Sequence, residues 1–196
     1  MLLSPLLPPN FHYTPSFLDQ SDQNFLQLSQ ELERKSYEIS MFGKKVLQPR
    51  LVAYCADEWV DYAYSQTKLY GHGWHPLLDQ VRQAIIHLYP QANSLNSVLC
   101  NLYRDGSDSM GRHADDESEL WDDPHIYSVT LGSERVFQIK SKGWKSQDSW
   151  QRYSLMLEDN SLLMMGSGSQ IDYVHSIPKT KKIIWPRINL TFRTIF

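Results

Sequence analysis

RINLTFR, at residues 187–193, is the clearest strand pattern in the chain. Successive side chains of a β-strand point to opposite faces of a sheet, so this segment has one polar and one apolar face. The polar face consists of Arg187, Asn189, Thr191 and Arg193, and the apolar face of Ile188, Leu190 and Phe192. The pattern fits an edge strand with one wet face. It also fits a strand whose polar face lines a dianion-binding pocket, because arginine binds planar carboxylates in a bidentate manner.

Similar β-rich runs fill the chain from Ser94 onward. They are SVLCNLY, IYSVTLG, RVFQIKS, YSLML, SLLMMG and KIIW, and turn residues such as DGSDS, GSE, EDN and GSGS separate them. Many short strands at this spacing predict an antiparallel sandwich or barrel.

The first part of the chain mixes helices with strands. Apolar residues at helical spacing predict one helix from Asp19 or Ser21 to about Lys35, and another from Pro76 to Tyr89. Residues 1–18 are expected to form an extended, Pro-rich arm. YEISMFGKKVLQPRLVAY predicts two strands around a Gly43-Lys44 turn.

We find no repeat, low-complexity tract or linker, so we predict one domain over residues 1–196. Its fold class is mostly β with accessory helices. Residues 1–93 are expected to form an accessory layer, and residues 94–196 the β core.

Composition is that of an ordinary globular protein, with 41% hydrophobic and 21% charged residues. No apolar run approaches the roughly 18 residues that span a membrane, and MLLSPLLPP lacks the basic start of a signal peptide. Cys55 and Cys100 are too few for a disulfide framework and are expected as free thiols. We therefore expect a monomer without a membrane partner in the cytoplasm, or in the nucleus of a eukaryote, and not a secreted protein.

The net charge of −3 is unevenly distributed. Between Arg104 and Asp123 there are eight acidic and two basic residues, a local charge of −6, which leaves +3 for the rest of the chain. Basic residues gather at Arg34/Lys35, at Lys44/Lys45/Arg50, over 140–145 and over 179–182. They are either scattered, solvated side chains or a basic rim around an acidic, metal-binding pocket.

Three residues have the composition of a metal site. His113 and Asp115 lie two apart in GRHADDE, and His175 lies far downstream in YVHSIPK. Two imidazoles and one carboxylate hold Fe(II) on one face and leave the other positions open. An H-x-D segment is common by chance, so the segments also fit surface histidines in loops. Asn101 and Tyr103 form another pair on one strand face, and their amide and phenol are suited to hydrogen bonding a carboxylate.

Four ordered blocks, NLYRDGSDSMGRHADDE, VTLGSERVFQIK, NSLLMMGSGSQIDYVHSIPK and PRINLTFR, resemble the AlkB family of Fe(II)- and 2-oxoglutarate-dependent nucleic-acid dealkylases. The resemblance covers about residues 49–196 and includes PRLVAYCAD and YAYS. It implies a double-stranded β-helix, or jelly roll, with an N-terminal nucleotide-recognition lid.

The resemblance implies a role for each matching residue. His113, Asp115 and His175 match the catalytic iron ligands. Asn101, Tyr103, Arg187, Asn189, Thr191 and Arg193 match the 2-oxoglutarate site, with Arg187 at the distal carboxylate. Asp116, Glu117, Tyr62, Tyr64, Phe42 and Arg50 are assigned to the substrate. Two departures, Tyr173 where many relatives have Trp and Lys140 where many have Arg, leave the triad intact and put substrate choice in doubt.

The implied activity is oxidative demethylation of bases such as 1-methyladenine and 3-methylcytosine in DNA, using Fe(II), O₂ and 2-oxoglutarate and releasing succinate, CO₂ and formaldehyde. The acids Asp116 and Glu117 favour such cationic bases by charge. Partners would be single- or double-stranded alkylated DNA, or RNA. Two different classes of protein compete with this interpretation. One is a dioxygenase of the same fold that hydroxylates a protein, lipid or small molecule, and the second is a non-catalytic nucleic-acid-binding module.

The segment from Met41 to Lys45 resembles the intercalating hairpin of family members that act on duplex DNA. An apolar tip at Phe42 would enter the base stack while two lysines contact phosphates. Phe42 would equally fit as a core residue of a two-stranded lid.

Overall fold

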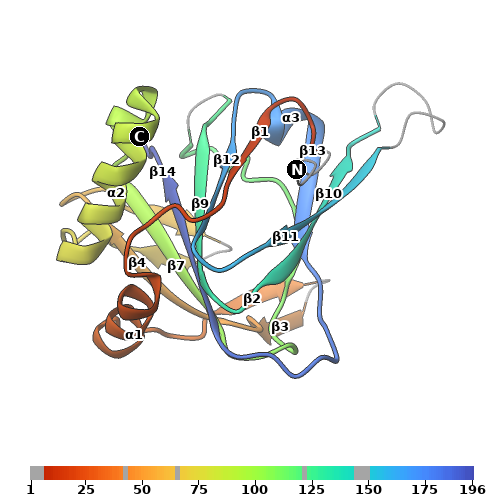
Figure 1. The fold of residues 1–196 in the computed structure, drawn as a ribbon, viewed down its shortest axis with the longest axis horizontal. Helices are drawn as coiled ribbons and strands as arrows, with labels where there is room; N and C mark the ends of the chain where they lie inside the picture. The colour runs from red at the N-terminus through yellow and green to blue at the C-terminus, as the bar shows by residue number, and fades with distance from the viewer. Residues whose placement is uncertain (1–6, 42–43, 65–66, 121–122, 144–150) are drawn as a thin grey trace.

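The structure is a computed structural model that describes residues 7–41, 44–64, 67–120, 123–143 and 151–196. Two antiparallel sheets form its centre, and Figure 1 shows them facing one another. The larger sheet has the order β1 (Phe11–Thr14), β12 (Ser161–Met165), β9 (Ile126–Gly132), β14 (Arg187–Arg193), β7 (Ser97–Tyr103) and β4 (Leu51–Ala56). The smaller has the order β11 (Arg152–Leu157), β10 (Arg135–Ser141), β13 (Tyr173–Ile177) and β8 (Met110–His113).

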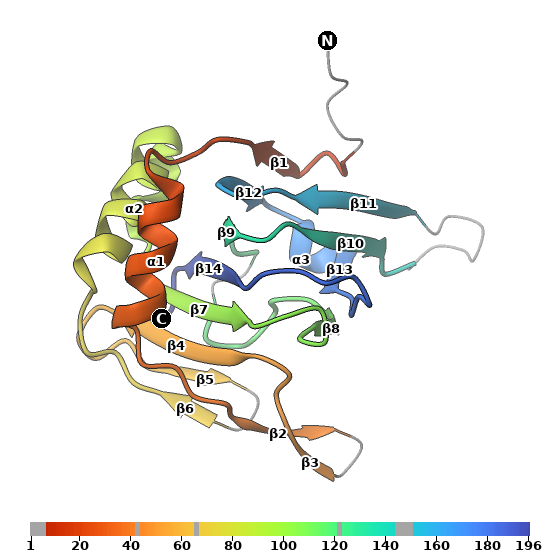
Figure 2. The ribbon, with the colours of Figure 1, turned by 60° about the horizontal axis from the view of Figure 1, so that its bottom comes forward.

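Helices α1 (Ser21–Glu31) and α2 (Pro76–Leu88) cover the outer face of the larger sheet, as Figure 2 shows. Ile188, Leu190 and Phe192 of β14 belong to the same buried cluster as the apolar residues of these helices. A second cluster joins the two sheets and includes Phe137, Leu155 and Ile177 of the smaller one. The polar face of β14 therefore points between the sheets.

Strand β14 lies at the centre of the larger sheet and not at an edge. It pairs with β9 on one side and β7 on the other, with Arg187 opposite both Gly132 and Tyr103. All seven of its residues are buried. The interpretation as an edge strand with a wet face is therefore wrong, and the mostly β, jelly-roll fold class is confirmed.

Two strands of the larger sheet, β1 and β4, come from the first 93 residues, so the sheet extends beyond the core that the sequence predicts. The predicted hairpin is present as β2 (Glu38–Met41) and β3 (Lys44–Leu47), while Phe42 and Gly43 lie outside the described residues. A second hairpin consists of β5 (Tyr62–Tyr64) and β6 (Thr67–Leu69). The other elements of the described residues are a 3-10 helix at Pro90–Ser94 and α3 (Ser169–Asp172).

The first helix is shorter than predicted. It begins after Gln20, whose backbone is left-handed and whose side chain forms no cap, so neither Asp19 nor Ser21 is the N-cap. It ends at Glu31 because Leu32 is extended and the Arg34 guanidinium donates to the Leu28 and Leu32 carbonyls. Lys35 then pairs with Val52 of β4. Helix α2 begins at Pro76 as predicted and ends one residue early.

The prediction that KIIW, at residues 182–185, forms a strand is wrong. Residues 183–185 form no regular element, and Ile183 and Trp185 are exposed. An apolar run forms a strand only where a neighbouring strand accepts its hydrogen bonds. Elsewhere, Cys55 and Cys100 are free, as expected. Among the described residues, no helix combines the length and the apolar character that crossing a membrane requires.

Candidate metal centre and dicarboxylate pocket

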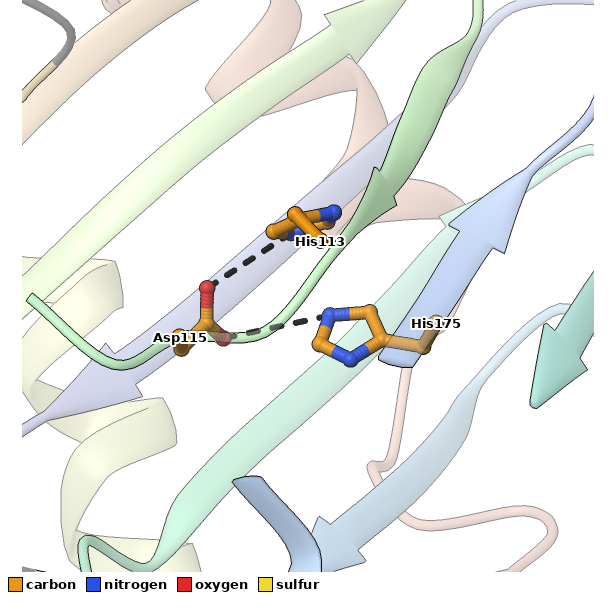
Figure 3. A group of neighbouring side chains, drawn as sticks. All are labelled: His113, Asp115 and His175. Atoms are coloured by element: carbon orange, nitrogen blue, oxygen red, sulfur yellow. Dashed lines mark ion pairs between the residues drawn. The ribbon is translucent and has the colours of Figure 1, made fainter. Parts of the chain in front are cut away.

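The three predicted metal ligands lie together between the two sheets (Figure 3). His113 ends β8 and lies opposite His175 of β13 in the strand register. Asp115 follows in an irregular segment, with its carboxylate 3.6 Å from His113 Nε2 and 4.0 Å from His175 Nε2. One ligand atom from each residue lies within 4.8 Å of the other two, which fits a single metal ion.

Neighbouring groups orient these ligands. The Gly111 carbonyl lies 2.9 Å from His113 Nδ1 and accepts its hydrogen, which leaves the lone pair on Nε2 for a metal. The Asp115 backbone N–H donates to Gln170 Oε1, and Arg193 Nη2 donates to Asp115 Oδ1 at 2.8 Å. The Phe137 ring stacks on His175 with centroids 5.2 Å apart.

The electrostatics favour the ligand forms of Asp115 and His175. Burial alone would raise the pKa of Asp115, but the Arg193 charge and the two imidazoles outweigh it and lower that pKa. Burial, followed by the charge of His113, lowers the pKa of His175 to about 3, so His175 is neutral at pH 7. For His113, burial lowers the pKa, yet the hydrogen bond and charge of Asp115 outweigh it and raise the pKa.

A pocket beside the triad contains the second set of predicted residues. It is lined by Asn101 and Tyr103 from β7 and by Arg187, Asn189, Thr191 and Arg193 from β14. The alternate polar residues that the sequence shows on these two strands therefore form one wall of the pocket. The structure brings all six residues and the triad into one pocket.

Arg187 has two buried donors without a partner among the described residues, compared with one, Nε, in Arg193 of the same pocket. Arg187 is 1% exposed, and its Nη2 donates to Thr130 Oγ1 at 2.9 Å. Its Nε and Nη1 have no partner within the part of the chain that the structure describes. Burial lowers its pKa to about 10. A buried guanidinium with two free donors fits one carboxylate of a dianion.

The other pocket residues already have protein partners. Asn101 accepts from Arg50 Nε at 2.7 Å, and Asn189 donates to Ser128 Oγ at 2.8 Å. Thr191 donates to Asn189 Oδ1. These contacts hold the polar side chains in place around the pocket. Arg50, which the sequence assigned to the substrate, is buried behind Asn101.

Of the residues predicted to contact a base, Tyr62 and Glu117 are linked to Asp115 by hydrogen bonds through Arg193. The Tyr62 hydroxyl donates to Glu117 Oε1 at 2.8 Å and accepts from Arg193 Nη1 at 3.0 Å. Tyr62 is fully buried, so it links site residues and presents no exposed stacking face. Asp116 is exposed and lies 3.4 Å from Lys142 Nζ. Tyr64 ends β5, and nothing is described of its side chain.

Sequence reasoning missed Thr130, Gln170 and Phe137. Thr130 and Ser128 alternate along the IYSVTLG strand, so their shared face was visible in the sequence. Phe137 alternates in the same way in RVFQIKS. Gln170 has no such signal, because it is brought to Asp115 by a short helix far along the chain.

Comparison with known proteins gives the class and then the family. Residues 10–193 match the 2OG-Fe(II) oxygenase superfamily, so the chain belongs to the Fe(II)- and 2-oxoglutarate-dependent dioxygenases. Within them it belongs to the AlkB family. It is 35% identical over 182 residues to the DNA oxidative demethylase ALKBH2 of Mus musculus, covering 90% of this chain and 75% of the relative.

Two further matches support the family and the fold, respectively. The alpha-ketoglutarate-dependent dioxygenase alkB homolog 3 of Bos taurus is 33% identical over 189 residues, which cover 93% of this chain and 65% of that relative. The solved structure of OsALKBH1 aligns with a TM-score of 0.61 at 19% identity, covering 96% of this chain and 99% of that chain, and supports the fold alone.

The residues present fit the cofactors of this family. His113, Asp115 and His175 would hold Fe(II), and Arg187 would bind the distal carboxylate of 2-oxoglutarate. When bound together with O₂, these groups supply the oxidising power for hydroxylation of a C–H bond.

Proposed function

We propose that this chain is a DNA oxidative demethylase that removes methyl groups from ring nitrogens of alkylated bases, such as those of 1-methyladenine and 3-methylcytosine. The observation that supports it most directly is the connected path from Asp115 through Arg193 and Tyr62 to Glu117. It places an acidic side chain beside the metal centre, where a cationic base would be recognised. The relatives named as DNA oxidative demethylases support the same conclusion.

Glu117 is suited to contact such a base. Its Oε1 is held by Tyr62, whereas its Oε2 is buried and has no partner among the described residues. A carboxylate oxygen in this state can accept a hydrogen bond from an exocyclic amino group, and its negative charge favours a cation. Arg193 orients Tyr62, and Tyr62 orients Glu117. The chain's own residues thus position the base, while the bound cofactors supply the oxidation.

A turnover assay tests this function. Purified protein with Fe(II), 2-oxoglutarate and O₂ should release formaldehyde from oligonucleotides that contain 1-methyladenine or 3-methylcytosine and should restore the normal base. Unmethylated oligonucleotides are the blank, and His113→Ala is the inactive control because it loses a metal ligand. Single strands, duplexes and RNA form separate arms. Absence of turnover on every arm by protein that binds iron would rule the proposal out.

Charge selectivity provides a sharper test. Glu117→Gln should lower kcat/KM for cationic 3-methylcytosine at least about tenfold more than for neutral 3-methylthymine, because about 1.4 kcal/mol of charge attraction corresponds to a factor of ten. Asp116→Asn is the matched control, since Asp116 is exposed and lies one residue away. Equal losses on the two bases would show that Glu117 does not recognise charge.

We further propose that the segment around Phe42 opens duplex DNA. Phe42→Ala should then reduce activity on duplex substrates far more than on single strands, because a wedge is needed only where bases are stacked. The Lys45→Ala variant should weaken the binding of single-stranded and duplex substrates to a similar extent, because it removes a phosphate contact that both can make. Equal losses on both substrates in Phe42→Ala would contradict the wedge.

A further inference from the structure

Arg135 is a buried arginine outside the residues assigned to the site. It is 3% exposed and begins β10, where it shares the inner face with Phe137 and Ile139. Phe137 lines the pocket and stacks on His175, and Leu157, the register partner of Arg135, also lines the pocket. Arg135 thus lies at the start of β10, on the face of the smaller sheet that points into the interior.

Its guanidinium donates to three backbone carbonyl oxygens. These are Asp105 O at 3.3 Å, Asp108 O at 2.9 Å and Pro178 O at 2.7 Å. The first two belong to the loop from β7 to β8, and the third follows β13. Strands β7, β8 and β13 contain Tyr103, His113 and His175. One side chain therefore connects the ends of three strands that supply the site.

Arg135 and Arg187 also lie beside the same phenol ring. Their Cζ atoms are 5.6 Å and 5.1 Å from the centroid of Tyr103, which is 3% exposed. Neither guanidinium forms an ion pair with a carboxylate in the described segments. Beyond the effect of burial, the charge of Arg135 further lowers the pKa of Arg187. Two buried positive charges therefore lie beside Tyr103, one on a residue that lines the pocket and one just outside it, and both would attract a carboxylate bound at this end.

We propose that Arg135 is a positioning residue for the distal carboxylate of 2-oxoglutarate. It holds Tyr103 beside Arg187 through the loop carbonyls, and its positive charge adds to the attraction for that carboxylate. The inference rests on the co-substrate of the family and is independent of the nucleic-acid substrate. If the protein failed to demethylate DNA, the proposal about Arg135 would still stand.

The test compares two 2-oxo acids that differ only at the distal end. Protein loaded with Mn(II) is titrated with 2-oxoglutarate and with 2-oxobutyrate, which lacks the distal carboxylate, and Kd is measured by calorimetry. Arg135→Met should raise Kd for 2-oxoglutarate about tenfold or more, equivalent to about 1.4 kcal/mol. Kd for 2-oxobutyrate should change less than about twofold, since only the distal carboxylate is affected.

Arg104→Met is the matched control. Arg104 binds Asp108 in the same loop through two hydrogen bonds, yet it is half exposed. It should leave the ratio of the two Kd values unchanged. Arg135→Lys keeps the charge, should recover part of the affinity, and serves in place of Arg135→Met if that variant does not fold. Equal weakening of both acids, or unchanged 2-oxoglutarate binding by a folded variant, would overturn the proposal.

Discussion

The two arginines of β14 are alike in sequence and different in structure. Both are buried on the same strand face, six residues apart. Arg193 forms an ion pair with Asp115 and a hydrogen bond with Tyr62, whereas Arg187 has Thr130 and two nitrogens without a partner among the described residues. Burial lowers the pKa of both, but for Arg193 the Asp115 charge outweighs it and raises the pKa.

This difference predicts that the two arginines contribute differently to stability and to ligand binding. The charge of Arg193 is compensated within the folded chain, so the fold depends on it. The charge of Arg187 is compensated only in part, so a ligand is needed to complete its hydrogen bonds. A buried donor left unpaired has a free-energy cost, and ligand binding removes that cost.

The largest expected effect is on stability. Arg193→Met would leave the Asp115 carboxylate buried without its cation, and breaking a buried ion pair from one side costs about 3–5 kcal/mol. Urea denaturation of metal-free protein should show this loss in the free energy of unfolding. A variant as stable as the parent would show that Arg193 does not hold the fold.

Arg187→Met should give the opposite result. Its stability should stay within about 1 kcal/mol of the parent, because removing a charge whose donors are unpaired also removes a desolvation cost. Its Kd for 2-oxoglutarate should rise about 30-fold or more, from the loss of about 2–5 kcal/mol for a buried charge pair. Calorimetry with Mn(II)-loaded protein measures the affinity. If stability falls as far as in Arg193→Met, the two arginines do not differ in role.

A smaller effect is expected at Tyr62. Tyr62→Phe removes the hydroxyl between Arg193 and Glu117, which should cost about 1–2 kcal/mol of unfolding free energy. Tyr54→Phe is the control, because Tyr54 stacks on Tyr62 and its hydroxyl donates to the Val60 carbonyl. A double-mutant cycle with Glu117→Gln should show coupling for Tyr62 and little for Tyr54. Additive losses would argue against the connected path.

The smallest effect is expected at Thr130. Thr130→Val removes the side-chain partner of Arg187 and should weaken 2-oxoglutarate binding about fivefold, as expected for one hydrogen bond of about 1 kcal/mol. Ser128→Ala, two residues earlier on the same face, loses a contact to Asn189 and should affect affinity less. A larger effect from Ser128→Ala would place the binding end of the pocket elsewhere.

Much of the site was predictable because its signals are local or depend on residue type. Alternation in RINLTFR showed which residues share a face, and His113, Asp115 and His175 showed the ligand set. Helix α2 was predictable because Pro76 begins it and its apolar period continues to its end. The fold class followed from the number of short strands.

Other features depend on contacts between distant segments. Helix α1 ends early because Arg34 caps it and Lys35 pairs with β4, and KIIW is not a strand because no neighbouring strand in the described ranges pairs with it. Arg135 looked like an ordinary polar residue at the start of a strand until the fold placed three carbonyls around it.

Sequence alone therefore determined which chemical groups this protein has and which of them share a strand face, because strand geometry repeats every two residues. The tertiary structure decided which of those groups are paired. Arg187 and Arg193 are equivalent by alternation, and only the segments packed against them pair Arg193 with Asp115 and leave Arg187 with two donors that have no partner among the described residues.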